Sequence, residues 1–179
     1  MEFVEHNEPL KGGPWGEFPD RYWRAYFGRS ADHYIDQLHL VQQGQRTSFN
    51  FPAFLVAFPW MAYRKMYLVL LCAVIVLLIE GTLEEVVFAL LGSTADTQTW
   101  ISRAASLVIG LCMGTFANRI YLWDARRRIR TVVNRGDLQV EERLLERIAR
   151  NGGTSWLAVL ALLACLLSLV YVADLVAHM

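Results

Sequence analysis

Apolar residues gather in three long blocks, which begin near Met66, Ala104 and Ser155, while the chain between the blocks is charged and of ordinary polarity. A helix needs about 20 apolar residues to cross the hydrocarbon layer of a bilayer. We therefore predict an all-α membrane protein with three transmembrane helices.

The three predicted spans differ in how easily they reach that length. The first block is apolar only over residues 66–79, about 21 Å of helix, so span one must continue past Glu80. Residues 66–91 are predicted as span one with an outer helix, which can be tilted or lie at the surface. Span two is predicted at residues 104–123 and span three at residues 155–173. Residues 174–179 form a short external tail.

A pair of amphipathic helices is predicted in residues 19–47, after a flexible acidic arm in residues 1–18. Gly28 can end the first helix and Ser30 can cap the second, which runs to Gly44. Four aromatic side chains share one face of the first helix, and an exposed face of this kind suits a protein partner or the membrane surface. These residues are Tyr22, Trp23, Tyr26 and Phe27.

Residues 48–65 are predicted to lie in the membrane interface or to form a re-entrant turn. Residues 48–50 offer a helix cap, and the apolar run that follows is too short to cross a bilayer and is interrupted by Pro59. Aromatic and basic side chains near its end suit the headgroup region. These expected interface anchors are Trp60, Tyr63, Arg64, Lys65 and Tyr67.

Basic residues are distributed unevenly around the predicted spans. Residues 119–150 hold nine arginines, whereas residues 66–118 hold only Arg103 and the tail after residue 172 holds no Lys or Arg. Cytoplasmic loops of membrane proteins are enriched in Lys and Arg. The pattern predicts a cytoplasmic N-terminus, an external C-terminus, and a basic cytoplasmic loop at residues 124–154. Within that loop Asp137 can cap a helix from Leu138 to about Arg150.

Polar groups within the apolar blocks are costly and often functional. The intramembrane candidates are Glu80, Asn118 and Arg119. Asn118 and Arg119 lie near the cytoplasmic end of span two. Their role there can be structural anchoring or contact with a ligand or partner. Glu80 and Glu84 are four residues apart and can share one face of a helix. They can mark the hydrated end of span one at the membrane interface, or they can form a cation or proton site.

Small residues and a basic run mark span two and its end. Gly110, Gly114 and Ala117 form a stripe that lets another helix approach closely, either from this chain or from another. The run that follows span two is expected to set topology and to contact anionic lipid or a protein partner. It consists of Arg126, Arg127, Arg128 and Arg130.

Composition and motifs predict neither catalysis nor a cofactor. The 17 basic and 17 acidic residues cancel, which removes an argument from bulk charge for nucleic-acid binding. The three cysteines fall one in each apolar block and match no metal-ligand spacing. No histidine lies inside a predicted span, and no nucleophile arrangement, phosphate loop or zincin motif occurs. We expect no enzymatic activity, no metal and no cofactor.

The string SFNFPAFLVAFPWMAYRKMY at residues 48–67 resembles a bacterial family of small multi-pass inner-membrane proteins of unknown function. In that family the SFN, AF, P-W and YRKMY elements lead into the first span, and Phe51 stands where a Trp is usual. Further similar positions are Tyr34, Ile35, Ala117, Asn118, Tyr121 and the string GGTS at residues 152–155. The resemblance covers about residues 22–170. It implies a bacterial inner-membrane protein and no particular reaction or ligand.

Together these observations predict a non-catalytic accessory, scaffolding or regulatory subunit of a larger inner-membrane assembly. The alternative is a small transporter or channel that works as a homo-oligomer, because three spans alone can hardly enclose a polar path. The expected partners are membrane lipids, including anionic lipids on the cytoplasmic side, and other membrane subunits or further copies of the chain.

Overall fold

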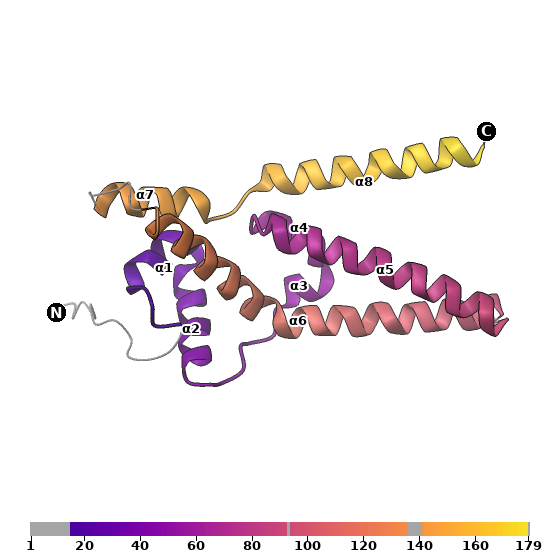
Figure 1. The fold of residues 1–179 in the computed structure, drawn as a ribbon, viewed down its shortest axis with the longest axis horizontal. Helices are drawn as coiled ribbons and strands as arrows, with labels where there is room; N and C mark the ends of the chain where they lie inside the picture. Colours follow the sequence, from indigo (N-terminus) through magenta and orange to yellow (C-terminus); the bar gives the residue numbers. More distant parts are fainter. Residues whose placement is uncertain (1–14, 93, 136–140, 179) are drawn as a thin grey trace. The chain divides into compact units, whose positions relative to one another are not determined.

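The computed structural model describes residues 15–92, 94–135 and 141–178, and its regular elements in these ranges are all helical (Figure 1). They are α1 (Asp20–Phe27), the 3₁₀ turn η1 (Gly28–Ser30), α2 (Ala31–Gln42), α3 (Phe51–Leu55), α4 (Ala57–Tyr63), α5 (Tyr67–Leu91), α6 (Ala95–Val133), α7 (Glu141–Asn151) and α8 (Trp156–Ala177). Three of these helices, α5, α6 and α8, are long and apolar enough to cross a membrane. The predicted fold class, three such helices preceded by N-terminal helices, is confirmed.

The chain forms two compact units. Unit 1 comprises residues 1–49 and 116–154, and unit 2 comprises residues 50–115 and 155–179. The helix α6 is 39 residues long, or about 58 Å, and contributes its first part to unit 2 and its last part to unit 1.

Unit 1 is built around an aromatic cluster shared by α1, α2 and α6. Trp23, Tyr26 and Phe27 are buried, and the ring centroids of Phe27 and Tyr34 lie 5.5 and 4.7 Å from that of Tyr121 on α6. The prediction that these α1 residues form an exposed face is therefore wrong. The reason is that the end of the predicted span two, from residue 116 on, belongs to unit 1, where Tyr121 gives the aromatic face a partner within the chain.

The helix α7 packs against α1 and buries Ile148 completely. Its end approaches α1 so closely that the Gly153 N–H donates to the Tyr26 carbonyl oxygen at 2.8 Å. A Cβ on Gly152 would lie 2.0 Å from that oxygen, so this position requires glycine. The described helix begins at Glu141, and the predicted cap Asp137 lies outside the described residues.

In unit 2, residues 50–63 form two short helices. The side-chain oxygen of Asn50 accepts a hydrogen bond from the Ala53 N–H at 2.9 Å, which confirms the cap expected before this run. The break between α3 and α4 falls at Val56, so the prediction that Pro59 interrupts the run is wrong. Pro59 is the third residue of α4, and in the first turn of a helix the backbone N–H has no intrahelical partner to lose.

The long helices of unit 2 have well-defined ends. The helix α5 continues without a break for 25 residues, about 38 Å, and ends at Gly92, which adopts the left-handed conformation common after a helix. Ser155 caps α8, because its hydroxyl oxygen accepts a hydrogen bond from the Ala158 N–H at 3.2 Å. In Figure 1 the start of α6 lies beside the end of α5, and Ser102 on α6 donates to Glu84 on α5 at 2.8 Å.

Apolar side chains remain exposed along α5, the first part of α6 and α8. Leu90 and Leu157 are 80% and 77% exposed, and they belong to a series that continues along each helix. Soluble monomers rarely expose contiguous apolar surface on this scale. The exposed surface therefore suits a hydrocarbon environment, as the lengths of the helices also indicate.

The contact between Gly110 and α3 supports a first prediction. A Cβ at Gly110 would lie 3.4 Å from the Phe54 ring, which leaves room for alanine and not for a branched side chain. We expect Gly110→Leu to destabilise the protein by about 1–3 kcal/mol through overpacking. Thermal unfolding in detergent measures the change. Gly81→Leu is the control, because nothing lies within 4 Å of a Cβ at Gly81; equal losses in the two variants would contradict the contact.

Candidate functional site

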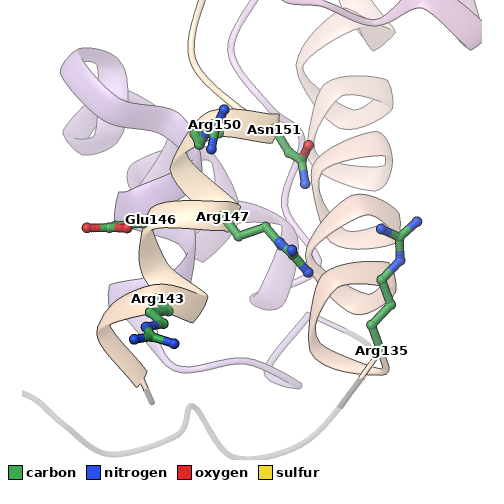
Figure 2. Close-up of a pocket in the computed structure, with 6 residues that line it drawn as sticks. All are labelled: Arg135, Arg143, Glu146, Arg147, Arg150 and Asn151. Atoms are coloured by element: carbon green, nitrogen blue, oxygen red, sulfur yellow. The ribbon is translucent and has the colours of Figure 1, made fainter. Parts of the chain in front are cut away.

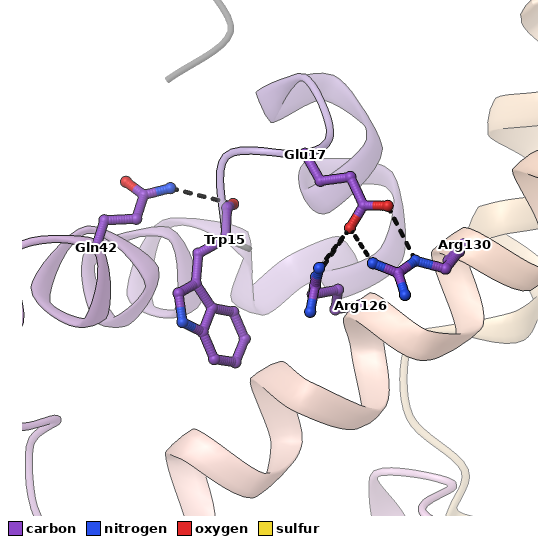
Figure 3. A network of polar contacts seen from close by, with 5 residues as sticks. All are labelled: Trp15, Glu17, Gln42, Arg126 and Arg130. Atoms are coloured by element: carbon purple, nitrogen blue, oxygen red, sulfur yellow. Dashed lines mark hydrogen bonds and ion pairs between the residues drawn. The ribbon is translucent and has the colours of Figure 1, made fainter. Parts of the chain in front are cut away.

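The charged residues of the candidate site lie mainly in unit 1, where the segment before α1 meets α6. Glu17 accepts hydrogen bonds from Arg126, with Nη2–Oε2 at 2.7 Å, and from Arg130, with Nε–Oε1 at 2.9 Å (Figure 3). The Trp15 carbonyl oxygen accepts a bond from Gln42 at 3.2 Å, and Phe18 is buried. Residues 15–18 are therefore packed, and the prediction that the flexible arm extends to residue 18 is wrong for them. Residues 1–14 lie outside the described residues.

The two arginines also change the acidity of Glu17. Hydrogen bonds from Arg130 and Arg126, together with their positive charges, hold the pKa of the Glu17 carboxyl below its ordinary value of 4.5. As the pH falls, the Glu17 carboxyl therefore becomes protonated at a higher pH in the unfolded chain than in the folded chain. The contribution of Glu17 to stability is complete above about pH 4.5 and is lost as the pH falls through the lower pKa of the folded state.

This linkage gives a pH-dependent prediction. We expect Glu17→Gln to lower the unfolding temperature in detergent by a few degrees at pH 7, since the ion pairs are partly exposed and pairs of this kind are weak. The difference from the wild type should shrink as the pH is lowered below 4.5. Glu142→Gln, at an exposed position on α7, is the matched control. A difference that stays constant or grows towards low pH would contradict the assignment.

A second carboxylate binds the middle of the arginine run. Asp124 is completely buried and pairs with Arg128 at 2.7 Å and with Arg127 at 3.4 Å. All four arginines of the run therefore have a carboxylate partner within the chain, which sequence reasoning missed. The spacing of three and four residues from Asp124 was a usable signal, because such pairs meet on a helix. Glu17, which is 109 residues from Arg126, left no such signal. Contact of the run with lipid or a partner stays a prediction.

Two polar atoms of α1 lie in the aromatic cluster. The Trp23 indole nitrogen and the Tyr26 hydroxyl are buried without a hydrogen-bond partner among the described residues. Burial raises the pKa of Tyr26 well above its ordinary value, and the nearby Asp124 carboxylate adds to the increase. The hydroxyl is therefore protonated at neutral pH, which fits a packing role better than acid–base chemistry. Tyr22, the fourth aromatic residue of α1, is partly exposed.

Asn118 is almost completely enclosed by protein. Its side-chain nitrogen donates to the Ser48 carbonyl oxygen at 2.9 Å, and the Ser48 N–H donates to the Gln37 side-chain oxygen at 2.7 Å. These bonds support structural anchoring, one of the two roles left open for Asn118. Arg119 is exposed instead, and it lines a shallow cavity of about 250 Å³. The other lining residues are Trp15, Phe116, Ile120 and Trp123.

The small-residue stripe of α6 contacts α3 of the same chain. Gly110 faces the Phe54 ring, and the Gly114 carbonyl oxygen accepts a hydrogen bond from the Asn50 N–H at 2.7 Å. Ala117 is buried. The stripe was predicted to pack against a helix of this chain or of another chain. Within this chain, α3 contacts both glycines directly.

The expected interface anchors divide into buried and exposed side chains. Trp60 is only 6% exposed, so its prediction as an anchor in the headgroup region is wrong; the reason is that α4 packs against α8. The Tyr63 ring lies 5.0 Å from that of Trp156 and 5.6 Å from the Arg64 guanidinium. Lys65 is partly exposed, and Tyr67 is exposed at the start of α5.

Two acidic residues of α5, Glu84 and Glu85, lie near polar residues of α6. Glu84, which accepts the Ser102 hydrogen bond, lines a groove of about 740 Å³ with Gln98, Thr99 and other residues of the two helices. Glu80 is partly exposed. Within the described ranges, no cluster of three or more His, Cys, Asp or Glu side chains is placed to hold a metal ion.

Comparison with known proteins gives a family and no activity. The family model described as "Protein of unknown function (DUF2628)" matches residues 20–127, from the start of α1 to the arginine run of α6. No curated protein and no solved structure matches the chain. The match covers more than half of the 179 residues, and the chain therefore belongs to the DUF2628 family, whose function is unknown.

Proposed function

We propose that this chain is a non-catalytic integral membrane protein that serves as an accessory, scaffolding or regulatory subunit of a larger assembly in a bacterial cytoplasmic membrane. In this proposal α5, α6 and α8 cross the bilayer, the N-terminus and α7 lie in the cytoplasm, and the C-terminus lies outside. The arginine-rich residues 119–150 support the orientation, and the string at residues 48–67 supports the bacterial origin.

The observation that carries the proposal is how the polar side chains near the spans are used. Asn118 binds the backbone of Ser48, Asp124 binds two arginines, and Glu84 accepts a bond from a serine. Each therefore has a bonding role inside the chain. The surface left for other molecules is mainly apolar and helical, which favours association with membrane helices over chemistry.

The helix α8 offers the longest surface of this kind. Its first residues pack against α4, whereas the apolar side chains from Leu166 to Val176 are exposed. In lipid there is little hydrophobic drive for helices to associate, so partner helices must pack closely or share polar groups. Ser168 lies on this part of α8, and the exposed Cys165 comes directly before it.

The three exposed cysteines, one on each long helix, allow a direct test. Variants that retain only Cys72, Cys112 or Cys165 are labelled in native membranes with a thiol-reactive photo-cross-linker, and the products are identified by mass spectrometry. We expect Cys165 to give a discrete adduct with a different membrane protein, and the complex isolated in mild detergent to contain that protein in a fixed ratio. A chain that migrates alone at its monomer mass, without protein adducts, would overturn the proposal.

The alternative is a transporter or channel formed by several copies, which the polar groove between α5 and α6 favours. Adducts between identical chains from all three cysteines would support it. In reconstituted vesicles, Glu80→Leu, Glu84→Leu or Arg119→Leu should then change proton or potassium flux. Flux equal to that of the wild type in all three variants would remove these residues from a transport path.

A further inference from the structure

Arg119 of α6 differs from the arginine run that follows it. Each arginine of the run pairs with Glu17 or Asp124, whereas no carboxylate within residues 15–92, 94–135 and 141–178 pairs with Arg119. Arg119 is exposed, and the other residues that line its cavity of about 250 Å³ are uncharged. The positive charge in the cavity wall is therefore available to an anion from outside the chain.

The rest of the cavity wall is apolar. Phe116, Ile120 and Trp123 lie three or four residues from Arg119, so the four side chains share one face of α6. Phe116 and Trp123 are 53% and 49% exposed. Tryptophan and arginine side chains are typical of the boundary between hydrocarbon and headgroups, because each combines an apolar body with a polar end. This face therefore suits an amphipathic occupant.

The remaining lining residue, Trp15, is held near α6 by contacts within the chain. Two residues after it, Glu17 binds Arg126 (Figure 3). The Arg126 guanidinium carbon lies 5.9 Å from the centre of the Trp15 ring, and that of Arg127 lies 5.7 Å from the centre of the Trp123 ring. Cations at these distances are attracted to aromatic rings. Both rings are thus positioned without a ligand, which lowers the entropy cost of binding.

The charge next to the cavity is also positive. One carboxylate, Glu17, is shared by Arg126 and Arg130, so these three residues keep a net charge of +1. Arg126 lies seven residues after Arg119, about 10 Å along the helix. Together with Arg119 this gives a charge of +2 on one part of α6. An occupant with a net negative charge is therefore favoured over a zwitterionic one.

Unit 1 has a second basic cleft, between α7 and the end of α6, which does not support the same reasoning (Figure 2). Two of its arginines, Arg147 and Arg150, already have an interaction within the chain. The positive charge of that cleft therefore gives no reason to expect an anion from outside. The residues that line it are Arg135, Arg143, Glu146, Arg147, Arg150 and Asn151.

We propose that the cavity at Arg119 binds one membrane phospholipid with an anionic headgroup. The Arg119 guanidinium donates to the phosphate oxygens, whereas Trp15, Phe116 and Trp123 contact the glycerol and the start of an acyl chain. Sites that enclose a whole small molecule measure roughly 300–1,000 Å³. This cavity is smaller, so it holds only part of the lipid, and the rest lies along the exposed apolar surface.

The site rests on the membrane position proposed above for α6. Arg119 then lies about 6 Å before the cytoplasmic end of span two, at Trp123, which is within reach of the headgroups for a long side chain. An arginine at this depth is stabilised by an anionic partner, because the apolar surroundings hydrate it poorly.

The test uses the full-length protein in a neutral detergent, to which phosphatidylglycerol or phosphatidylcholine is added at fixed ionic strength. Native mass spectrometry counts the bound lipids, and a saturable rise in unfolding temperature measures their binding. We expect the wild type to bind one phosphatidylglycerol more tightly than phosphatidylcholine. Arg119→Gln should weaken phosphatidylglycerol binding at least about tenfold and remove most of the preference, because a charge-assisted bond to the phosphate is lost.

Arg103→Gln is the matched control and should bind lipid as the wild type does. Arg103 is also exposed on α6, and its guanidinium carbon lies 5.5 Å from the centre of the Trp100 ring. Trp123→Ala tests the apolar wall and should weaken the binding of both lipids to a similar degree. No saturable response, or equal weakening in the Arg119 and Arg103 variants, would overturn the proposal. A protein adduct at Cys165 without a lipid response would contradict this site and leave the accessory role standing.

Discussion

Gly152→Ala is expected to prevent stable packing of α7 on α1. The added Cβ would lie 2.0 Å from the Tyr26 carbonyl oxygen and 2.7 Å from its carbonyl carbon, and these backbone atoms cannot rotate away as a side chain can. Relief requires α7 to separate from α1, with loss of the Gly153 to Tyr26 hydrogen bond and exposure of Ile148. We expect a cost of about 4 kcal/mol or more, which places the substitution among the most damaging.

The effect of Gly152→Ala is measured by thermal unfolding in detergent and by limited proteolysis between α6 and α7. Gly81→Ala is the control, because its Cβ meets open space within a helix, where alanine is favoured over glycine. The close approach of α7 to α1 would be contradicted if the Gly152 variant unfolded at the wild-type temperature and resisted protease equally well.

Trp23→Ala is expected to have the second largest effect. The indole ring is fully buried, with its centroid 5.8 Å from that of Phe27 and 6.3 Å from that of Phe18. Its truncation leaves a cavity in the aromatic cluster and removes a large apolar contact, at a cost of about 3–5 kcal/mol. No hydrogen bond from the indole nitrogen to a described residue is lost, so the cost reports packing alone.

Denaturant unfolding in detergent, followed by far-UV circular dichroism, measures this cost. Trp100→Ala is the matched control, because Trp100 on α6 is 70% exposed. We expect the Trp100 variant to remain close to the wild type in detergent. Similar stability of the two variants would mean that α1 does not pack in the core of unit 1.

Features determined by local pattern were predictable from the sequence. The three long apolar runs predicted the three helices because bilayer thickness sets a minimum length for a spanning helix. Helix ends at Gly28 and Asn50 followed from the conformational freedom of glycine and from capping chemistry. Both depend on residues only a few positions apart.

Features that depend on distant residues were not predictable in the same way. The spacing of Trp23, Tyr26 and Phe27 shows that they share a helix face, but not that Tyr121 on α6 covers it. A single sequence also gives no sign that Glu17 reaches Arg126. In both cases the prediction gave a surface to lipid or to a partner, whereas the chain itself covers that surface or neutralises its charge.

The most direct test of the account is the topology of the three spans, measured in whole cells with a membrane-impermeant maleimide. Single cysteines are placed in a background without Cys72, Cys112 and Cys165, by Thr94→Cys between α5 and α6, Glu142→Cys on α7 and His178→Cys after α8. If the proposed topology is right, positions 94 and 178 are labelled in intact cells, and position 142 is labelled only after the membrane is opened. Labelling that places positions 94 and 178 on opposite sides of the membrane would contradict it.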